Sequence, residues 1–200
     1  MSISLYSGTP GSGKSLRAAY KLIEWRKMGR AVIANFPISD DYFSKFKKKL
    51  GSFTYVENRD LSVPYLREYA KENHIPFKEH QTLLIIDECA SMFNSRNWDR
   101  KDRSDWILFF QQHRKLGYDV ILISQSDRLI DRQIRAFIEM EYKHRALTHY
   151  KTFGWILSLI CGGLFYWSEY WYGMNLKTNG SLFLLNRKKA KIYDSFKIFE

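Results

Sequence analysis

The sequence contains few cysteines and prolines, and no charge-free segment reaches the roughly 20 residues that a membrane-spanning helix needs. Its two cysteines, Cys89 and Cys161, lack C-x-x-C spacing, and no histidine is spaced with them as a metal ligand would be. These features exclude a disulfide-rich secreted scaffold and a zinc-ribbon domain, and they predict a reducing, cytoplasmic environment. Because the amino terminus has no basic segment followed by an apolar one, we expect no signal peptide.

Acidic residues are scarce relative to basic ones: 21 Asp and Glu against 32 Lys and Arg give a net charge of +11. This excess favours an anionic partner, either nucleic acid or the cytoplasmic surface of a membrane. The densest basic cluster comprises Lys45, Lys47, Lys48 and Lys49. Such a cluster is typical of a solvated helix face, and direct binding of nucleic acid is the alternative.

A glycine-rich octapeptide near the amino terminus carries the strongest functional signal. It comprises Gly8, Thr9, Pro10, Gly11, Ser12, Gly13, Lys14 and Ser15, and it lies between a strand-like and a helix-like segment. This setting is typical of a phosphate-binding loop, whose backbone N–H groups and following helix N-terminus surround a polyphosphate. We expect Lys14 to reach the β and γ phosphates of a nucleoside triphosphate and Ser15 to bind Mg²⁺. The alternative is a glycine-rich turn without a ligand.

A second motif, at residues 83–88, supplies the carboxylates that such a loop requires. The run Leu83-Leu84-Ile85-Ile86 is typical of a strand buried on both faces, and it ends in Asp87 and Glu88. In this Walker B pattern, we expect Asp87 to hold the Mg²⁺ shell and Glu88 to polarise the water that attacks the γ-phosphate. The alternative is a strand end whose acids cap the next helix.

Apolar and helix-like segments alternate along the chain and predict a doubly wound, mainly parallel α/β sheet. We expect strands at residues 2–6, 31–36, 53–56, 82–87 and 119–125, and helices at residues 14–28, 40–49, 62–73, 105–116 and 127–136. Residues 1–150 are predicted to form a P-loop NTPase domain. Residues 151–200 are predicted to form a β-rich, aromatic extension.

The strand at residues 119–125 ends in an amide, Gln125. In the additional-strand class of P-loop ATPases, this strand lies between the P-loop strand and the Walker B strand. We therefore expect Gln125 to face the γ-phosphate and act as a phosphate sensor. The alternative is that Gln125 caps the helix predicted at residues 127–136.

Residues 153–167 form the most apolar stretch of the chain and contain no charge. The pair Gly162-Gly163 and the aromatic residues that follow favour a β hairpin packed on the core. An interfacial membrane contact and a true membrane span are the alternatives. Further along, Asn179-Gly180 is a strong signal for a turn between two strands.

Taken together, these elements resemble the zonular occludens toxin family, which includes the filamentous phage assembly ATPases. Residues 8–15, 83–90, 112–126 and 192–195 carry the resemblance, and residues 112–126 are its most specific part. The resemblance implies an ATP- and Mg²⁺-dependent motor that couples nucleotide to extrusion of single-stranded phage DNA. It also implies a homo-oligomer that contacts phage assembly proteins at the inner face of the cytoplasmic membrane.

Arg114, near the end of a predicted helix, is a candidate arginine finger that acts on a neighbouring subunit's nucleotide. The alternative is a surface arginine that interacts with the helix dipole, and Arg96, Arg100 and Arg103 compete for the finger role. Two other functions stay open: a DNA translocase or packaging ATPase of the same fold, and a small-molecule P-loop kinase. Glu88 argues against the kinase because it suits activation of water.

Overall fold

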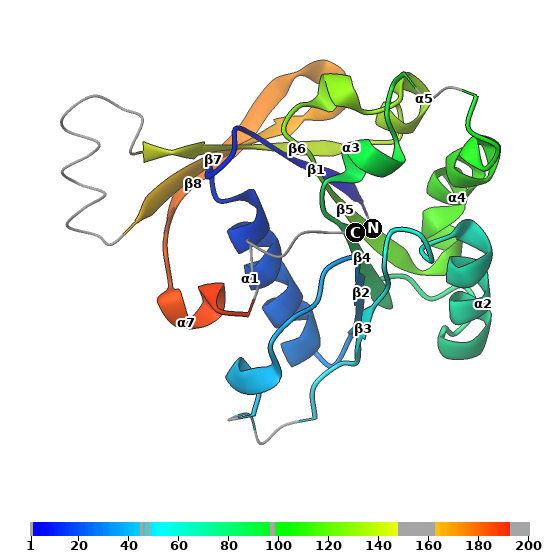
Figure 1. Cartoon of the computed structure of the whole chain (residues 1–200), viewed down its shortest axis with the longest axis horizontal. Coiled ribbons are helices and arrows are strands. Elements are labelled where there is room, and N and C mark those ends of the chain that lie inside the picture. The colour runs from blue at the N-terminus through cyan, green and yellow to red at the C-terminus, as the bar shows by residue number, and fades with distance from the viewer. Residues whose placement is uncertain (1, 45, 47–48, 97–98, 148–162, 193–200) are drawn as a thin grey trace.

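A computed structural model describes residues 2–44, 46, 49–96, 99–147 and 163–192. One eight-stranded sheet, in the order β3-β2-β4-β5-β1-β6-β7-β8, runs through the molecule (Figure 1). The strands are β1 (Ile3–Ser7), β2 (Ala31–Ala34), β3 (Phe53–Tyr55), β4 (Thr82–Ile86), β5 (Tyr118–Ile123), β6 (Met140–Ala146), β7 (Leu164–Trp171) and β8 (Leu176–Leu184). The first six are parallel, whereas β7 and β8 are antiparallel to their neighbours.

Helices cover both faces of the parallel part of the sheet. Its central strands carry apolar side chains on both faces, and these side chains are buried. Helix α1 (Lys14–Lys27) packs on one face, where alternate strand residues such as Leu83 and Ile85 are buried against it. Helices α2 (Val63–Asn73) and α4 (Arg103–Leu116) pack on the other face against residues such as Leu84. Figure 1 shows α1 on one side of the sheet and α2 and α4 on the other. The predicted α/β P-loop fold is confirmed.

Strand β5 lies between β1 and β4, as the additional-strand class predicts. Its residue Ile121 pairs with Ser4 of β1 on one side and with Ile85 of β4 on the other. Because the three strands are parallel, their carboxyl ends lie at one edge of the sheet. The glycine-rich loop, the Asp87-Glu88 pair and Gln125 therefore meet at that edge.

Strand β6, next to β1, was not among the strands expected from the sequence. Its residues Glu141, Lys143 and Arg145 line a hollow on one face, while Tyr142 and His144 pack on the face that carries α1. The side that lines the hollow is charged, so the strand does not show the apolar run typical of its parallel neighbours.

Two predicted helices are much shorter than expected. Residues 127–136 form a 3₁₀ turn, Asp127–Leu129, and a short helix, α5 (Arg132–Arg135). The chain breaks between them because Leu129 accepts a backbone hydrogen bond from Ser95 and Asp131 donates one to Phe93. The helix predicted at residues 40–49 is reduced to the 3₁₀ turn Asp40–Tyr42 in the part of this segment that the structure describes.

The carboxyl-terminal extension, where described, is a β hairpin that continues the sheet, followed by a short helix, α7 (Arg187–Ala190). The turn prediction for Asn179-Gly180 was wrong, because both residues lie inside β8 and the hairpin turns at Tyr172–Met174 and Asn175. A Cβ atom at Gly180 would lie 2.5 Å from the Tyr166 hydroxyl, so the glycine makes room for a cross-strand ring.

The three interpretations of residues 153–167 stay predictions. Residues 164–167 belong to β7, and residues 153–162 lie outside the described residues. Among the helices formed by described residues, none is long and apolar enough to cross a membrane.

Candidate nucleotide-binding site

The glycine-rich loop has the backbone conformation that its three glycines permit. Gly8, Gly11 and Gly13 have φ values of 142°, 72° and 90°, which side-chain-bearing residues rarely adopt. Gly8 also allows a close approach, because a Cβ atom there would lie 2.3 Å from the carbonyl oxygen of His144. Such a loop leads directly into α1, so its N–H groups and the helix dipole favour an anion.

Lys14 lies within this loop rather than in solvent. Its Nζ donates hydrogen bonds of 2.8 and 3.0 Å to the carbonyl oxygens of Gly8 and Thr9. Burial lowers the pKa of Lys14, and the neighbouring Asp87 and Glu88 carboxylates oppose that shift. The Ser12 hydroxyl is fully buried and has no hydrogen-bond partner among the described residues. The loop thus offers a cation and an unpaired hydroxyl, which fit a polyphosphate.

Ser15 and Asp87 bring the two predicted metal ligands together. The Ser15 hydroxyl donates a hydrogen bond of 3.0 Å to Oδ2 of Asp87, and Asp87 is 4% exposed. A hydroxyl and a carboxylate oxygen beside a phosphate loop are the hard oxygen donors that Mg²⁺ prefers. These residues therefore fit a magnesium ion bound together with a nucleotide.

Glu88 is exposed and has the left-handed backbone conformation, with φ of 48° and ψ of 40°. Its N–H donates to the Asp87 carboxylate at 2.8 Å. The side chain makes no capping hydrogen bond to the short helix α3 (Cys89–Met92) that follows. The alternative in which these acids cap the next helix was therefore wrong for Glu88.

Gln125 lies at the end of β5, where its carbonyl oxygen accepts a hydrogen bond of 3.3 Å from the N–H of Gly8. It does not cap a helix: Ser126 caps the 3₁₀ turn and Asp131 caps α5, each through a side-chain oxygen. The capping alternative for Gln125 is therefore wrong. Its side chain is exposed beside the glycine-rich loop, and the role of phosphate sensor stays a prediction.

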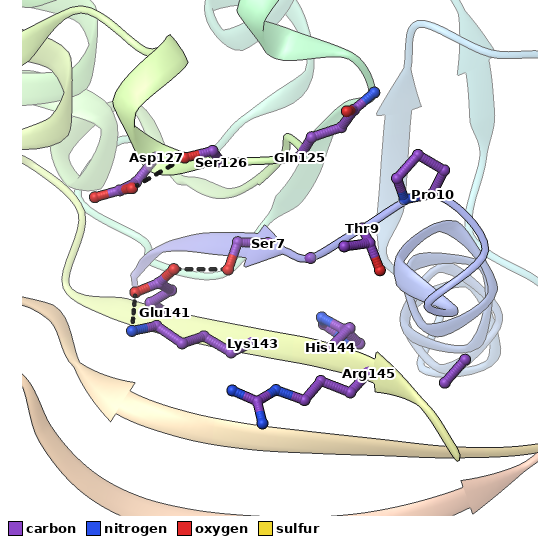
Figure 2. Close-up of a pocket in the computed structure, with 12 residues that line it drawn as sticks. Ser7, Thr9, Pro10, Gln125, Ser126, Asp127, Glu141, Lys143, His144 and Arg145 are labelled. Carbon is purple, nitrogen blue, oxygen red and sulfur yellow. Dashed lines mark hydrogen bonds and ion pairs between the residues drawn. The ribbon is translucent and has the colours of Figure 1, made fainter. Parts of the chain in front are cut away.

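A hollow of about 550 Å³ lies beside the loop, between the end of β5 and strand β6 (Figure 2). Its lining comprises Ser7, Gly8, Thr9, Pro10, Gln125, Ser126, Asp127, Glu141, Lys143, His144, Arg145 and Ala146. Along its floor, Glu141 accepts a hydrogen bond of 2.6 Å from Ser7 and forms an ion pair of 3.4 Å with Lys143. The hollow thus continues the phosphate loop with polar and charged groups.

The structure places Arg114 away from this site. It lies near the end of α4, just before β5 begins, whereas the loop is at the opposite, carboxyl edge of the sheet. Its guanidinium pairs with Glu79 at 3.2 Å. Of its competitors, Arg100 pairs with Asp102 and Arg103 pairs with Asp131, while Arg96 is exposed. A role for Arg114 on a neighbouring subunit stays a prediction.

Sequence reasoning missed how closely the carboxyl-terminal hairpin approaches the loop. The rings of Phe165 and Phe183 stack with centroids 5.3 Å apart, and a Cβ atom at Gly13 would lie 2.8 Å from the Phe165 ring. One turn into α1, the Arg17 guanidinium lies 3.6 Å from the centroid of the Trp167 ring. The aromatic composition of residues 164–172 was the one signal in the sequence, and it does not indicate which other residues these rings contact.

Comparison with known proteins agrees with this geometry. The sequence profile described as zonular occludens toxin (Zot) matches residues 2–155, which is most of the chain. The chain belongs to the Zot family. Its relatives include the Gene 1 protein of Enterobacteria phage I2-2, which is 29% identical over 167 residues, or 82% of this chain and 46% of that protein. The Gene 1 protein of Enterobacteria phage M13 is 29% identical over 142 residues, or 68% and 39% of the two chains. This Zot-family chain thus spans less than half the length of these relatives.

Solved structures of similar fold include a Zot domain and a genome packaging NTPase. The N-terminal domain of zonular occludens toxin from Neisseria meningitidis has a TM-score of 0.55 at 17% identity, covering 96% of this chain and 98% of that one. The genome packaging NTPase B204 from Sulfolobus turreted icosahedral virus 2, solved with ATP-gammaS, has a TM-score of 0.55 at 15% identity, covering 88% and 95%. At these identities the likeness supports the fold alone.

Proposed function

We propose that this Zot-family chain binds ATP with Mg²⁺ and hydrolyses it as the motor of filamentous phage assembly. The observation that carries the proposal is the hydrogen bond between Ser15 and Asp87, which joins the phosphate loop to the Walker B strand. The similarity of the chain's sequence to phage Gene 1 proteins supports the role in assembly. In this role the chain acts as a homo-oligomer at the inner face of the cytoplasmic membrane, with single-stranded DNA and phage assembly proteins as partners.

Each site residue has a role in this proposal. Residues 8–15 surround the phosphates, and Lys14 exchanges its contacts with Gly8 and Thr9 for phosphate oxygens. Ser15 and Asp87 hold Mg²⁺, which when bound neutralises charge on the phosphate oxygens. Glu88 orients the attacking water, and Gln125 responds to the γ-phosphate.

A packaging ATPase of the same fold is the second candidate, favoured by the similarity in fold to B204. The two functions differ in their activators: single-stranded DNA and membranes for the assembly motor, and duplex DNA for packaging. A small-molecule kinase fits less well, because Glu88 follows the metal-binding Asp87 at an exposed position suited to water.

The test measures ATP binding by calorimetry and phosphate release, with and without single-stranded DNA, duplex DNA and anionic vesicles. The variant Lys14→Ala loses a charge-assisted contact to phosphate, so we expect ATP affinity to fall by about 10- to 100-fold. The control is Lys21→Ala, which removes an exposed lysine of the same helix that pairs with Glu24. Equal ATP affinity in the parent and the Lys14 variant would disprove the assignment of the phosphate loop.

A further inference from the structure

Asn35, the residue that follows β2, is 1% exposed and lies beside the Walker B carboxylates. Main-chain pairing between β2 and β4 ends with Ala34 opposite Ile85, and the N–H of Asn35 donates a last bond of 3.3 Å to the carbonyl oxygen of Ile85. Beyond that point the side chain of Asn35, and not its main chain, forms the hydrogen bonds to the chain that follows β4. Its Oδ1 accepts from the N–H of Asp87 at 2.7 Å, and its Nδ2 donates to the carbonyl oxygen of Asp87 at 2.8 Å.

A carboxamide suits this position because it has the donor and acceptor of a peptide group. Asn35 thus extends the β2–β4 ladder by one more residue, after the two main chains have stopped pairing. Its Nδ2 also donates to Oδ1 of Asn58 at 2.8 Å, which fixes the orientation of the amide. Aspartate would lose both of these donated bonds, and alanine would leave both main-chain groups of Asp87 buried without this partner.

The backbone that Asn35 holds determines where two carboxylates point. The Asp87 side chain extends from it to Ser15, and the next peptide donates the Glu88 N–H to Asp87 Oδ1 at 2.8 Å. Glu88 keeps the left-handed conformation, with φ of 48°, which is unfavourable for a residue with a side chain. Such a conformation persists where the surrounding structure holds it, and Asn35 bonds both main-chain groups of the preceding residue, Asp87.

We propose that Asn35 is a positioning residue, which holds the Asp87 main chain so that Asp87 and Glu88 present their carboxylates to the metal ion and the attacking water. The inference rests on the function proposed above. Asn35 acts through Asp87, in the way that outer-shell groups orient the residues that bind a metal, whose loss typically costs about 10- to 100-fold in metal affinity.

The test uses the full chain and separates metal binding from nucleotide binding and from stability. ATP affinity is measured in EDTA with a fluorescent ATP analogue, Mn²⁺ affinity of the ATP complex by electron paramagnetic resonance, and stability by thermal unfolding. For Asn35→Asp and Asn35→Ala we expect metal-free ATP affinity to stay within about twofold and Mn²⁺ affinity to fall by about 10-fold or more. For Asn58→Ala, which removes only the bond that orients the amide, we expect a smaller loss.

The matched control is Thr82→Val, at the start of β4, the strand that ends just before Asp87. Thr82 is fully buried, and its hydroxyl hydrogen-bonds the half-buried His74 at 2.6 Å, so this variant also removes a hydrogen bond from β4. We expect it to lower the unfolding temperature and to leave Mn²⁺ affinity unchanged.

Normal Mn²⁺ affinity in the folded Asn35 variants would overturn the inference, even if their unfolding temperature fell. If both Asn35 variants fail to fold, Asn58→Ala decides, and unchanged Mn²⁺ affinity there has the same meaning. Failure of the parent chain to bind ATP would instead contradict the proposed function, so the two failures are distinguishable.

Discussion

The Ser15 hydroxyl and the Asp87 carboxylate meet at 3.0 Å although 72 positions separate them in the chain. Ser15 lies at the start of α1, which follows β1, and Asp87 directly follows β4. Strands β1 and β4 are not neighbours, because β5 lies between them. The contact therefore depends on three parallel strands that end at one edge of the sheet. A nucleotide held by the loop lies within reach of both Walker motifs at that edge. The first prediction therefore concerns the separate roles of Asp87 in metal binding and of Glu88 in hydrolysis.

We predict that Asp87→Ala and Glu88→Gln fail in different ways. Asp87→Ala removes the proposed metal ligand, so Mg²⁺ affinity should fall, while Glu88→Gln should keep Mg²⁺-ATP and lose about 100-fold or more in hydrolysis. Binding is measured by calorimetry and turnover by phosphate release. The control is Glu68→Gln, an exposed position on α2. Unchanged turnover in the Glu88 variant would remove Glu88 from the mechanism.

A second prediction compares two glycines that share a left-handed conformation. Gly13, with φ of 90°, lies against the rings of Phe165 and Phe183, whereas Gly29, with φ of 75°, faces open space. Alanine at either position costs about 1–2 kcal/mol of backbone strain. At Gly13 the clash adds about 1–3 kcal/mol, so Gly13→Ala should destabilise the chain more in urea unfolding and also weaken ATP binding. Equal losses of stability at the two sites would contradict the packing of the hairpin on the loop.

A third prediction concerns His144, which is 1% exposed and whose ring nitrogens make no hydrogen bond of good geometry to described residues. Burial, with the Arg17 charge adding to it, lowers the pKa of His144 from 6.5 to about 3. The folded state therefore binds fewer protons than the unfolded state below pH 6.5, so stability is lost as the pH falls from that value towards 3. Between pH 7 and pH 5 this histidine should account for about 2 kcal/mol of lost unfolding free energy.

The variant His144→Phe isolates this contribution, because the half-buried His74 and the buried His113, whose pKa values burial also lowers, remain in both proteins. We expect the variant to lose less stability than the parent between pH 7 and pH 5, as measured by urea unfolding at each pH. Parallel pH profiles for the two proteins would show that His144 is not held neutral by its surroundings.

The fourth prediction concerns catalysis between subunits. The Arg114 side chain is 59% exposed, and its pair with Glu79 is a surface ion pair, worth about 0–1 kcal/mol. Arg114→Ala should therefore fold and bind ATP normally, yet lose hydrolysis. Mixing it with Glu88→Gln subunits should restore part of the activity. Glu79→Ala is the control for loss of the ion pair alone. Activity that is independent of protein concentration, in a demonstrated monomer, would refute the prediction.

Much of the phosphate site could be predicted from local sequence. The glycine spacing of residues 8–15 sets the left-handed positions of the loop, because only glycine adopts them without strain. The apolar run that ends in Asp87 defined a doubly buried strand, and the polar end of β5 indicated the additional strand. These features depend on a few adjacent residues, so they are visible without knowledge of distant contacts.

The tertiary structure alone decided what surrounds that site. Strand β6 carries charged residues that face a hollow, Asn179 and Gly180 pair across a hairpin instead of forming its turn, and Phe165 packs against Gly13. Asn35 is an ordinary polar residue in sequence, and it becomes part of the site only because β2 pairs with β4. Each of these relationships joins segments far apart in the chain, and local propensity carries no information about which distant partner a side chain meets.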